Sequence, residues 1–206
     1  MGKEAPLLDD DIEWSALDVH GDFSGRVADR LEISERRLTG ARFTASALGR
    51  ARITDSVFVG CDLSGTALPE ATLVRVEFCE CRMVGFGAAA ATLRDVRLTD
   101  CRLVDADFRM STADRIHFEG CDLAGADLYG ARWAGAALFD SDLTGAELSK
   151  ASLPGGRLQG STLTGLRGAT SLHGVTIDSA QILPMALQMF ASLGIAVDDE
   201  RAPGGG

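Results

Sequence analysis

The sequence CDLAGADLYG, at residues 121–130, contains one five-residue pattern twice. Each copy begins with a small residue, continues with Asp and a central Leu, and ends with Gly. The stretch CDLSG at residues 61–65 repeats the pattern, and the register holds from Phe23 to Leu163. Every fifth residue of this span is apolar: 16 Leu, 6 Phe, 2 Ile, three Ala, Met83 and Trp133. The chain therefore contains an internal repeat with a period of five residues.

A period of five fits neither an α-helix nor a β-strand, because neither element keeps one face buried at that spacing. A chain that turns a corner every five residues does fit it. The central residue and the small residue two positions earlier then point inward. The position two after the centre holds 13 of the 24 Gly, which we expect to supply the positive φ of the corner. Four sides make a coil of 20 residues, and successive coils stack as parallel strands about 4.8 Å apart.

The predicted fold is an all-β solenoid: a quadrilateral parallel β-helix of about seven four-sided coils, about 34 Å long, with a short C-terminal helix. Residues 1–20 are predicted to be an acidic N-terminal lead and cap, in which Ile12, Trp14 and Leu17 cover the first coil. Residues 21–165 are predicted to form the β-helix, regular from about residue 41, because Arg26 and Arg36 place charge at inward positions before that point. Residues 166–197 are predicted to be a closing segment with the helix, and residues 198–206 a disordered tail.

The 206 residues carry a net charge of −10, with a pI of about 4.7. Residues 1–20 contribute −5 and residues 166–206 contribute −2, which leaves −3 for the repeat. Such an acidic surface argues against nonspecific binding of nucleic acid or of an anionic membrane. No stretch approaches the roughly 18 apolar residues of a membrane span, and the N-terminus does not read as a secretory signal. With five Cys, an odd number typical of a reducing compartment, we predict a cytoplasmic protein.

Four of the cysteines are spaced by 20 residues, at Cys61, Cys81, Cys101 and Cys121. They would form a line along one inner edge, whereas zinc needs four ligands that converge on one point. We interpret them as small apolar residues and expect Cys79, in an outward column, to be the exposed thiol. No carboxylate pair and no Ser with a base recurs at a spacing that converges across coils. We therefore predict no enzymatic activity, no metal and no cofactor.

The excess acid of the repeat lies on one flank of its C-terminal half. When sides are assigned by position modulo 20, two adjacent sides carry six carboxylates against Arg102, Arg109 and Lys150. We call these six the acidic flank: Asp105, Asp107, Asp122, Asp127, Asp142 and Glu147. Stacked like charges repel, so their cost can mark a partner-binding surface. Alternatively, the acid before each central residue is a turn residue whose side chain accepts hydrogen bonds from nearby backbone N–H groups.

The register fails at Gly168, and a helix is predicted to follow an irregular segment. Asp178 or Ser179 can cap this helix, with Gln181 in range of a capping box, and Pro184 is expected to kink it or to start its second half. Six apolar residues recur at helical spacing, and we expect this stripe to cover the last coil: Ile182, Leu183, Ala186, Met189, Phe190 and Leu193.

Met185 and Leu187 fall outside that stripe, so the helix has a second apolar face. An apolar face that the last coil does not cover is suited to pairing with another copy of the chain. We therefore predict a homodimer contact formed by Met185, Met189, Phe190 and Leu193. The alternative is a fully buried cap on a monomer.

The five-residue pattern resembles the motif of the pentapeptide-repeat family: a small residue, Asp or Asn, Leu or Phe, and two variable positions. The matches at residues 61–65, 121–125 and 126–130 are close, and the resemblance covers about 145 residues in one register. It implies a right-handed quadrilateral β-helix. Members of the family often pair through their C-terminal ends, which agrees with the predicted homodimer.

The best-known functional branch of that family comprises fluoroquinolone-resistance and topoisomerase-poison self-resistance proteins, whose acidic rods resemble duplex DNA and occupy the DNA saddle of gyrase. Our first hypothesis is a non-catalytic interaction scaffold that binds a protein partner through the acidic flank. The alternative is a DNA mimic that binds DNA gyrase and confers resistance to quinolones or another topoisomerase poison. Neither hypothesis involves direct contact with nucleic acid or with a membrane.

Overall fold

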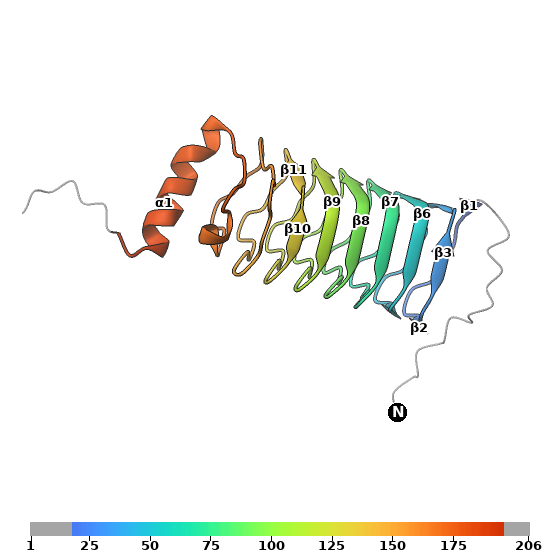
Figure 1. Ribbon diagram of the computed structural model, residues 1–206. Helices are drawn as coiled ribbons and strands as arrows, with labels where there is room; N and C mark the ends of the chain where they lie inside the picture. Colours follow the sequence, from blue (N-terminus) through green and yellow to red (C-terminus); the bar gives the residue numbers. More distant parts are fainter. Residues whose placement is uncertain (1–17, 196–206) are drawn as a thin grey trace, which may run out of the picture.

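The computed structural model describes residues 18–195, which form a rod of stacked coils with one helix at its C-terminal end (Figure 1). The chain winds around the rod axis as a quadrilateral parallel β-helix. Residues 1–17 of the predicted N-terminal lead and cap, with Ile12, Trp14 and Leu17, and the predicted tail at residues 198–206 lie outside the described residues. No helix within the described part is long and apolar enough to cross a membrane.

The described residues contain eleven strands, all of them paired in parallel. In chain order they are β1 (Asp18–Val19), β2 (Val27–Asp29), β3 (Glu32–Ser34), β4 (Arg37–Thr39), β5 (Ala47–Gly49), β6 (Arg52–Val59), β7 (Thr72–Cys79), β8 (Thr92–Thr99), β9 (Thr112–Glu119), β10 (Arg132–Ala134) and β11 (Ala137–Phe139).

The register between coils is 20 residues, as the repeat predicts. Leu73 pairs with Leu93, and the same offset relates β6, β7, β8 and β9 to one another. At the two ends the offset falls to 19, because Val19 pairs with Leu38 and Arg157 with Thr176. The 20-residue register therefore continues through the repeat and slips by one residue where the repeat begins and ends.

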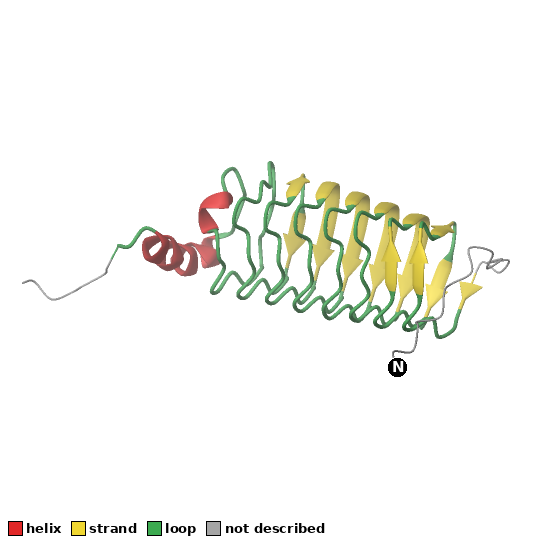
Figure 2. Ribbon diagram, turned by 90° about the horizontal axis from the view of Figure 1, so that it is seen from below, coloured by secondary structure: helices red, strands yellow, loops and turns green. Residues whose placement is uncertain are grey.

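Two kinds of side alternate around each coil. The eight-residue strands β6–β9 each run across a corner and cover two adjacent sides, which we call the strand sides. The other two sides, which in one coil are centred on Leu103 and Phe108, consist of turns linked to the next coil by single bridges; we call them the turn sides. Figure 2 shows the strand arrows along one part of the coils and loops along the rest.

The core is a filled column of central and small side chains. Every central residue from Ala28 to Leu163 is buried, and so is the inward column from Ala41 onward. Aromatic rings stack along the rod, for example Phe58 on Phe78 with centroids 4.8 Å apart. The indole N–H of Trp133 donates to Ser111 Oγ at 2.9 Å, which satisfies the buried polar atom.

The corners differ from the expectation that Gly supplies their positive φ. All 29 corner positions from Gly25 to Gly165 have positive φ, but 16 of them are not Gly. Positive φ costs a non-Gly residue about 1 kcal/mol. The cost is offset because coil-to-coil hydrogen bonds hold the corner, as when the N–H of Arg50 donates to Pro69 O at 2.9 Å.

Gly is required by close packing where the repeat ends. Gly168 has φ 74, and a Cβ there would overlap the backbone of Ser149 in the coil below. A side chain therefore cannot be accommodated at residue 168 in this backbone conformation, so Gly is required where the chain leaves the repeat.

The first coil holds its two arginines without burying them. Arg26 and Arg36 are half-buried, and their backbone N–H groups donate to the hydroxyls of Ser46 and Ser56 in the next coil, both at 3.2 Å. Strand pairing already includes β1, so the coils are stacked from residue 18 onward. The inward positions of the first coil are therefore less buried than those of later coils, but the backbone of the first coil is still hydrogen-bonded to the next one.

Beyond the repeat, two short 3-10 helices, η1 (Ala169–Ser171) and η2 (Ser179–Gln181), lead into α1 (Ile182–Ser192). Asp178 caps η2 as predicted: its side chain accepts from the N–H of Gln181, and its own N–H donates to the side chain of Gln181. The Nε2 of Gln181 donates to the carbonyls of Leu158 and Ser161, and that of Gln188 to Leu163 O, all at 2.6 Å. These amides supply partners for carbonyls on the open edge of the last coil, which would otherwise lack them.

The predicted covering stripe of the helix is wrong. Its members Ile182, Leu183, Met189, Phe190 and Leu193 are all exposed, and Ala186 is half-buried. Met185, predicted to lie at a dimer contact, is instead buried in the core cluster with only 6% of its surface exposed. The reason is that the open edge offers carbonyls as well as apolar surface, so the face with Gln181 and Gln188 turns inward and Met185 goes with it.

Candidate interaction surfaces

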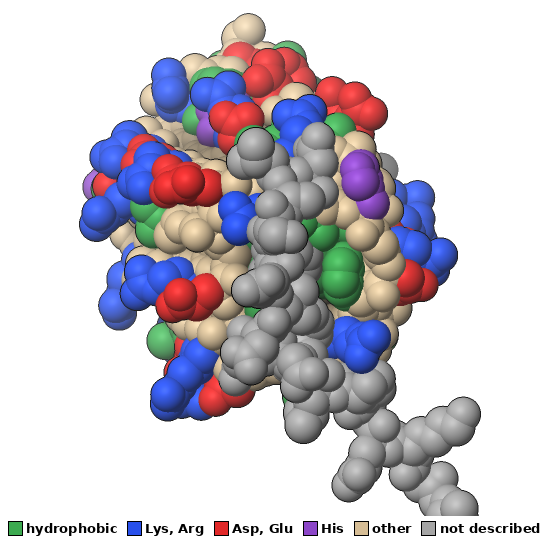
Figure 3. All heavy atoms as spheres, turned by 90° about the vertical axis from the view of Figure 1, so that its right-hand side faces the viewer, with side chains coloured by type: hydrophobic (Ala, Val, Ile, Leu, Met, Phe, Trp, Pro, Cys, Tyr) green, Lys and Arg blue, Asp and Glu red, His purple; other side chains and the backbone are tan. Residues whose placement is uncertain are grey.

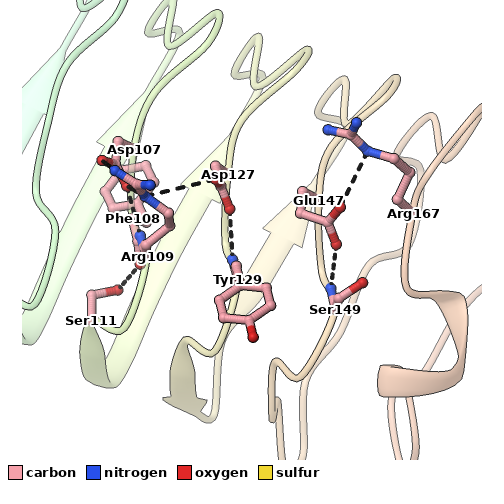
Figure 4. A network of polar contacts seen from close by, with 9 residues as sticks. All are labelled: Asp107, Phe108, Arg109, Ser111, Asp127, Tyr129, Glu147, Ser149 and Arg167. Carbon is pink, nitrogen blue, oxygen red and sulfur yellow. Dashed lines mark hydrogen bonds and ion pairs between the residues drawn. The ribbon is translucent and has the colours of Figure 1, made fainter.

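The acidic flank lies on the turn sides as the modulo-20 assignment predicts. Single parallel bridges place Asp107 opposite Asp127 and Asp127 opposite Glu147, so these three form one ladder. A second ladder on the adjacent turn side pairs Asp122 with Asp142. Figure 4 shows the first ladder with its carboxylates on successive coils.

Five of the six flank carboxylates make the same local contact. Each accepts a hydrogen bond from the backbone N–H two residues further on, at distances from 2.6 Å for Glu147 to 3.2 Å for Asp122. Asp62, which lies in the same column as Asp122 but three coils earlier and outside the flank, does the same with Ser64. The shared geometry supports the interpretation that these acids are turn residues, because each satisfies an N–H group of its own turn.

Asp105 is the exception. It is itself a corner residue with φ 56, it is exposed, and no N–H of its own turn donates to it in the described structure. Its carboxylate is therefore free for a partner, whereas the turn has already engaged one oxygen of the other five.

Arginines neutralise part of the ladder. Arg109 donates to both oxygens of Asp107, at 2.9 and 2.7 Å, and its Nε lies 3.7 Å from Asp127. Arg167 lies 3.3 Å from Glu147, and Arg102 lies 3.6 Å from Asp122. The local electrostatic field of the flank is therefore weaker than six carboxylates alone would produce.

Sequence reasoning missed Arg167, because it stands two residues past the predicted end of the repeat. Its spacing could have identified it: Arg167 follows Glu147 by 20 residues and bridges to it in the parallel register. A salt partner one coil away is recognisable from the same modulo-20 assignment that located the flank.

The pKa values of the ladder follow from these contacts. Burial raises the pKa of Asp107, but the hydrogen bonds from Arg109 outweigh it and leave that pKa below its usual value. The hydrogen bond from Ser149 lowers the pKa of Glu147, with Arg167 adding to the effect. Both carboxylates are consequently ionised at neutral pH, so the ladder keeps its negative groups.

Where the two strand sides meet, acids of the corner column pair with arginines of the next coil. Arg75 lies 2.5 Å from Asp55, and Arg115 lies 2.6 Å from Asp95. Seen from its N-terminal end, the rod carries basic and acidic side chains next to one another around its rim (Figure 3).

Most of the exposed large apolar side chains among the described residues lie on α1 or directly after it. Leu183 is 69% exposed, Leu193 63%, Ile182 59% and Leu187 55%. Met189 and Phe190, two of the predicted dimer residues, also lie on this exposed surface. An exposed apolar patch of this kind is typical of a protein–protein contact. The sequence prediction missed Ile182, Leu183 and Leu187 because it assigned the first two to the covering face and left Leu187 out of the dimer contact.

The cysteine ladder is buried, as predicted. Cys81 and Cys101 each donate to a carbonyl one coil below, Phe58 O at 3.5 Å and Phe78 O at 3.4 Å. Cys79 is half-buried, less exposed than we expected, and burial raises the pKa of its thiol. Within residues 18–195 no group of three or more His, Cys, Asp or Glu side chains is placed to hold a metal ion.

Comparison with known families agrees with this architecture. A family model described as "Pentapeptide repeat region" matches residues 32–108 and 75–148, and one described as "Pentapeptide repeats (8 copies)" matches residues 134–165. The chain belongs to the pentapeptide-repeat family. No curated protein matches it.

Among solved structures, the chain is similar to QnrB1, described as a plasmid-mediated fluoroquinolone resistance protein, with 23% identity over 86% of this chain and 92% of that one and a TM-score of 0.45. It is similar to HetL from the cyanobacterium Nostoc, described as involved in heterocyst differentiation regulation, with 23% identity over 77% and 75% and a TM-score of 0.38. A pentapeptide-repeat protein of the Arabidopsis thaliana thylakoid lumen is 19% identical over 66% and 68%, with a TM-score of 0.34. At these values the likenesses carry no argument about function.

Proposed function

We propose that this protein is a non-catalytic scaffold that binds a protein partner through the acidic flank. The observation that supports the proposal is the pair of carboxylate ladders on the turn sides, with Asp105 exposed and unengaged at the corner between them. A filled β-helix core offers no converging catalytic groups, so its outer surface is what such a fold can use. All five cysteines are free thiols, which suits the reducing cytoplasm that we propose as its location.

The flank is tested with substitutions that keep the turns. Asn accepts the same backbone N–H as Asp but carries no charge, so Asp105→Asn/Asp127→Asn/Asp142→Asn removes charge without breaking the turns. A matched control removes three charges elsewhere: Glu32→Gln/Glu70→Gln/Asp100→Asn. Each protein is immobilised, and the proteins it retains from a cell extract at low salt are compared. We expect a protein that the wild type and the control retain and the flank variant loses; equal retention by all three would overturn the proposal.

The second candidate is a DNA mimic that binds DNA gyrase. The two carboxylate ladders running along a rod favour it, since stacked negative groups imitate a phosphate backbone. Duplex DNA, however, carries one negative charge per about 1.7 Å, about 20 over the length of this rod, whereas the repeat has a net charge of only −3. For this reason we rank the mimic second.

A supercoiling assay separates the two candidates. The scaffold predicts no effect on gyrase at a large molar excess of the protein, with or without a quinolone. Inhibition by the wild type and by the control variant, together with its loss in Asp105→Asn/Asp127→Asn/Asp142→Asn, would establish the mimic instead.

We also propose that the protein pairs through the outward face of α1. The face is formed by Ile182, Leu183, Leu187, Met189, Phe190 and Leu193, of which Met189, Phe190 and Leu193 belong to the predicted dimer set. Leu187→Asp/Phe190→Asp should convert a dimer to a monomer in size-exclusion chromatography with light scattering, because a buried charge opposes association. Met110→Asp, at a residue 56% exposed on the rod, is the control and should stay dimeric. A monomeric wild type would end this idea.

A further inference from the structure

A groove of about 490 Å³ runs along the corner between the two strand sides. One wall is the corner column, with Arg75 and Arg115, and the other is the column two positions later, with Arg97 and His117. The inward column between them forms the floor, where Val96 lies. The lining residues span positions 75 to 157 along the repeat, so the groove extends over about 19 Å at the coil spacing.

Small residues open the groove at its C-terminal half. Gly135 and Ala137 occupy outward positions that hold Arg115 and His117 in the coil before. Phe139 contacts a basic side chain on each side of Ala137. Its ring centroid lies 5.4 Å from that of His117 and 5.2 Å from the guanidinium carbon of Arg157. One aromatic side chain therefore holds two basic side chains on either side of Ala137.

The charges of the groove are only partly neutralised. Arg75 and Arg115 pair with Asp55 and Asp95, as described above. His117 lies 3.4 Å from Glu119. Arg97 and Arg157, in contrast, make no ion pair with any described residue. Glu77 also lines the groove and is the neighbour of Arg97 in the strand register, but the two side chains form no ion pair. The guanidinium groups of Arg97 and Arg157 are therefore the charges that the groove can offer to an acidic ligand.

The spacing of Arg97 and Arg157 indicates the size of that ligand. They are three coils apart in one column, about 14 Å along the rod. A single phosphate or carboxylate cannot reach both. In an extended peptide, residues i and i+4 point to the same side and lie about 14 Å apart, since each residue advances the chain by about 3.4 Å.

We propose that this corner groove binds an extended acidic segment of a protein partner, with two carboxylates four residues apart on Arg97 and Arg157. The groove holds about six residues of such a segment. The two strand sides meet at the corner that holds the groove, and the two turn sides meet at the corner that holds Asp105. These two corners lie diagonally opposite each other in the coil. The site is thus separate from the acidic flank, and the rod has two surfaces of opposite sign.

The proposal is tested with a fluorescein-labelled seven-residue Gly/Ser peptide that carries Glu at its second and sixth positions. Fluorescence anisotropy at low salt measures its binding to the full chain. A second peptide with Glu at the second and third positions has the same charge but the wrong spacing. We expect it to bind at least about threefold more weakly, because it can engage only one of the two arginines. Equal affinity for both peptides would overturn the proposed spacing.

Charge reversal locates the site. Arg97→Glu/Arg157→Glu should weaken the spaced peptide by at least about tenfold, since two attractive contacts become repulsive. Arg42→Glu/Arg82→Glu makes the same change in net charge on a turn side and should leave binding within about twofold. An equal loss in both variants would show nonspecific attraction and overturn the proposal. Circular dichroism and the thermal midpoint establish that each variant is folded.

Filling the groove tests its shape without changing charge. Ala137→Leu should weaken the peptide at least about fivefold. Ala137 is 2% exposed and lies between His117 and Arg157 in one column, so the larger side chain must displace these two lining residues. Ala67→Leu, at an exposed outward position of a turn side, is the control and should bind like the wild type. Unchanged affinity in Ala137→Leu would place the peptide elsewhere and overturn the proposal.

Two further outcomes would replace the proposed occupant. Full competition by an equal concentration of inorganic phosphate would mean a small-anion site. A large gain in peptide affinity in the full-length variant Asp9→Lys/Asp10→Lys/Asp11→Lys would mean that this chain's own acidic segment competes for the groove. We expect the apparent affinity of the peptide to change by no more than about twofold, both with added phosphate and in this variant.

Discussion

The acidic flank and the corner groove each centre on a corner where two like sides meet, yet their charged side chains behave differently. On the turn sides, an acid directly before a central residue accepts a hydrogen bond from the backbone N–H two residues on, as at Asp127 and Glu147. In the groove, Asp95 is itself a corner residue, and its carboxylate pairs with Arg115 of the next coil. The position of an acid within the five-residue unit therefore decides whether its carboxylate bonds its own turn.

The largest expected effect tests what the two regions share. Leu128, beneath a turn side, and Phe118, beneath a strand side, are both almost fully buried. Leu128→Ala should cost about 2–5 kcal/mol of unfolding free energy and Phe118→Ala about 3–5 kcal/mol, because each leaves a cavity in the same column. Urea denaturation followed by circular dichroism measures both. A loss below about 1 kcal/mol at either position would mean that the two sides do not share one packed core.

A smaller effect should separate the regions. Asp127→Ala removes the acceptor of a turn N–H and should cost about 1 kcal/mol, whereas Asp127→Asn keeps the acceptor and should cost much less. Asp95→Ala, on a strand side, should fall closer to the Asn variant because it breaks only an exposed ion pair. Thermal midpoints of the three variants rank them. Equal losses for Asp127→Ala and Asp127→Asn would refute the turn-residue interpretation.

Acid should destabilise the turn sides more than the strand sides. The pKa values of Asp107 and Glu147 are lowered in the folded state, so their contribution to stability is present above their ordinary values of 3.8 and 4.5 and is lost as pH falls through the folded values. Between about pH 5 and pH 3 the urea midpoint should therefore decrease. Asp107→Asn/Glu147→Gln should flatten that decrease more than Asp55→Asn/Asp95→Asn. The carboxylates of Asp55 and Asp95 are more exposed than those of Asp107 and Glu147, so water screens their interactions more strongly. The reverse order would contradict this assignment.

The smallest expected effect is that of salt on the strand-side ion pairs. Arg75→Gln and Arg115→Gln break the pairs with Asp55 and Asp95, of which only Asp95 is half-buried and the other three residues are exposed. Because counterions already screen such pairs, raising the NaCl concentration from 0.1 to about 1 M should shift the thermal midpoint of the wild type and of the two variants by nearly the same amount. A much larger salt effect in the wild type would show that these pairs contribute to stability.

The ends of the rod show where sequence patterns lose their predictive power. The helix at residues 182–192 and the Asp178 cap of η2, which leads into it, were predictable, because capping depends on neighbouring residues. Its inward face was not. Apolar spacing favoured Phe190 and Leu193 as the covering residues, but the carbonyls on the open edge of the last coil select Gln181 and Gln188. The apolar spacing of a helix identifies its possible contact faces. Which face packs inward depends on the polar and apolar groups of the surface that it covers.

The sequence by itself determined the coil. A five-residue period with a buried centre admits one arrangement, so the 20-residue register, the buried cysteine ladder and the stacking of Asp107, Asp127 and Glu147 all follow from counting. Three features depend on the tertiary structure and not on the repeat period. They are which sides become strands, which carboxylates accept hydrogen bonds from their own turns, and how Phe139 holds Arg157 beside Ala137. The physical reason is that position along a repeat is fixed by its period, whereas side-chain contacts between coils depend on which backbone groups are still free and on the volume of each neighbour.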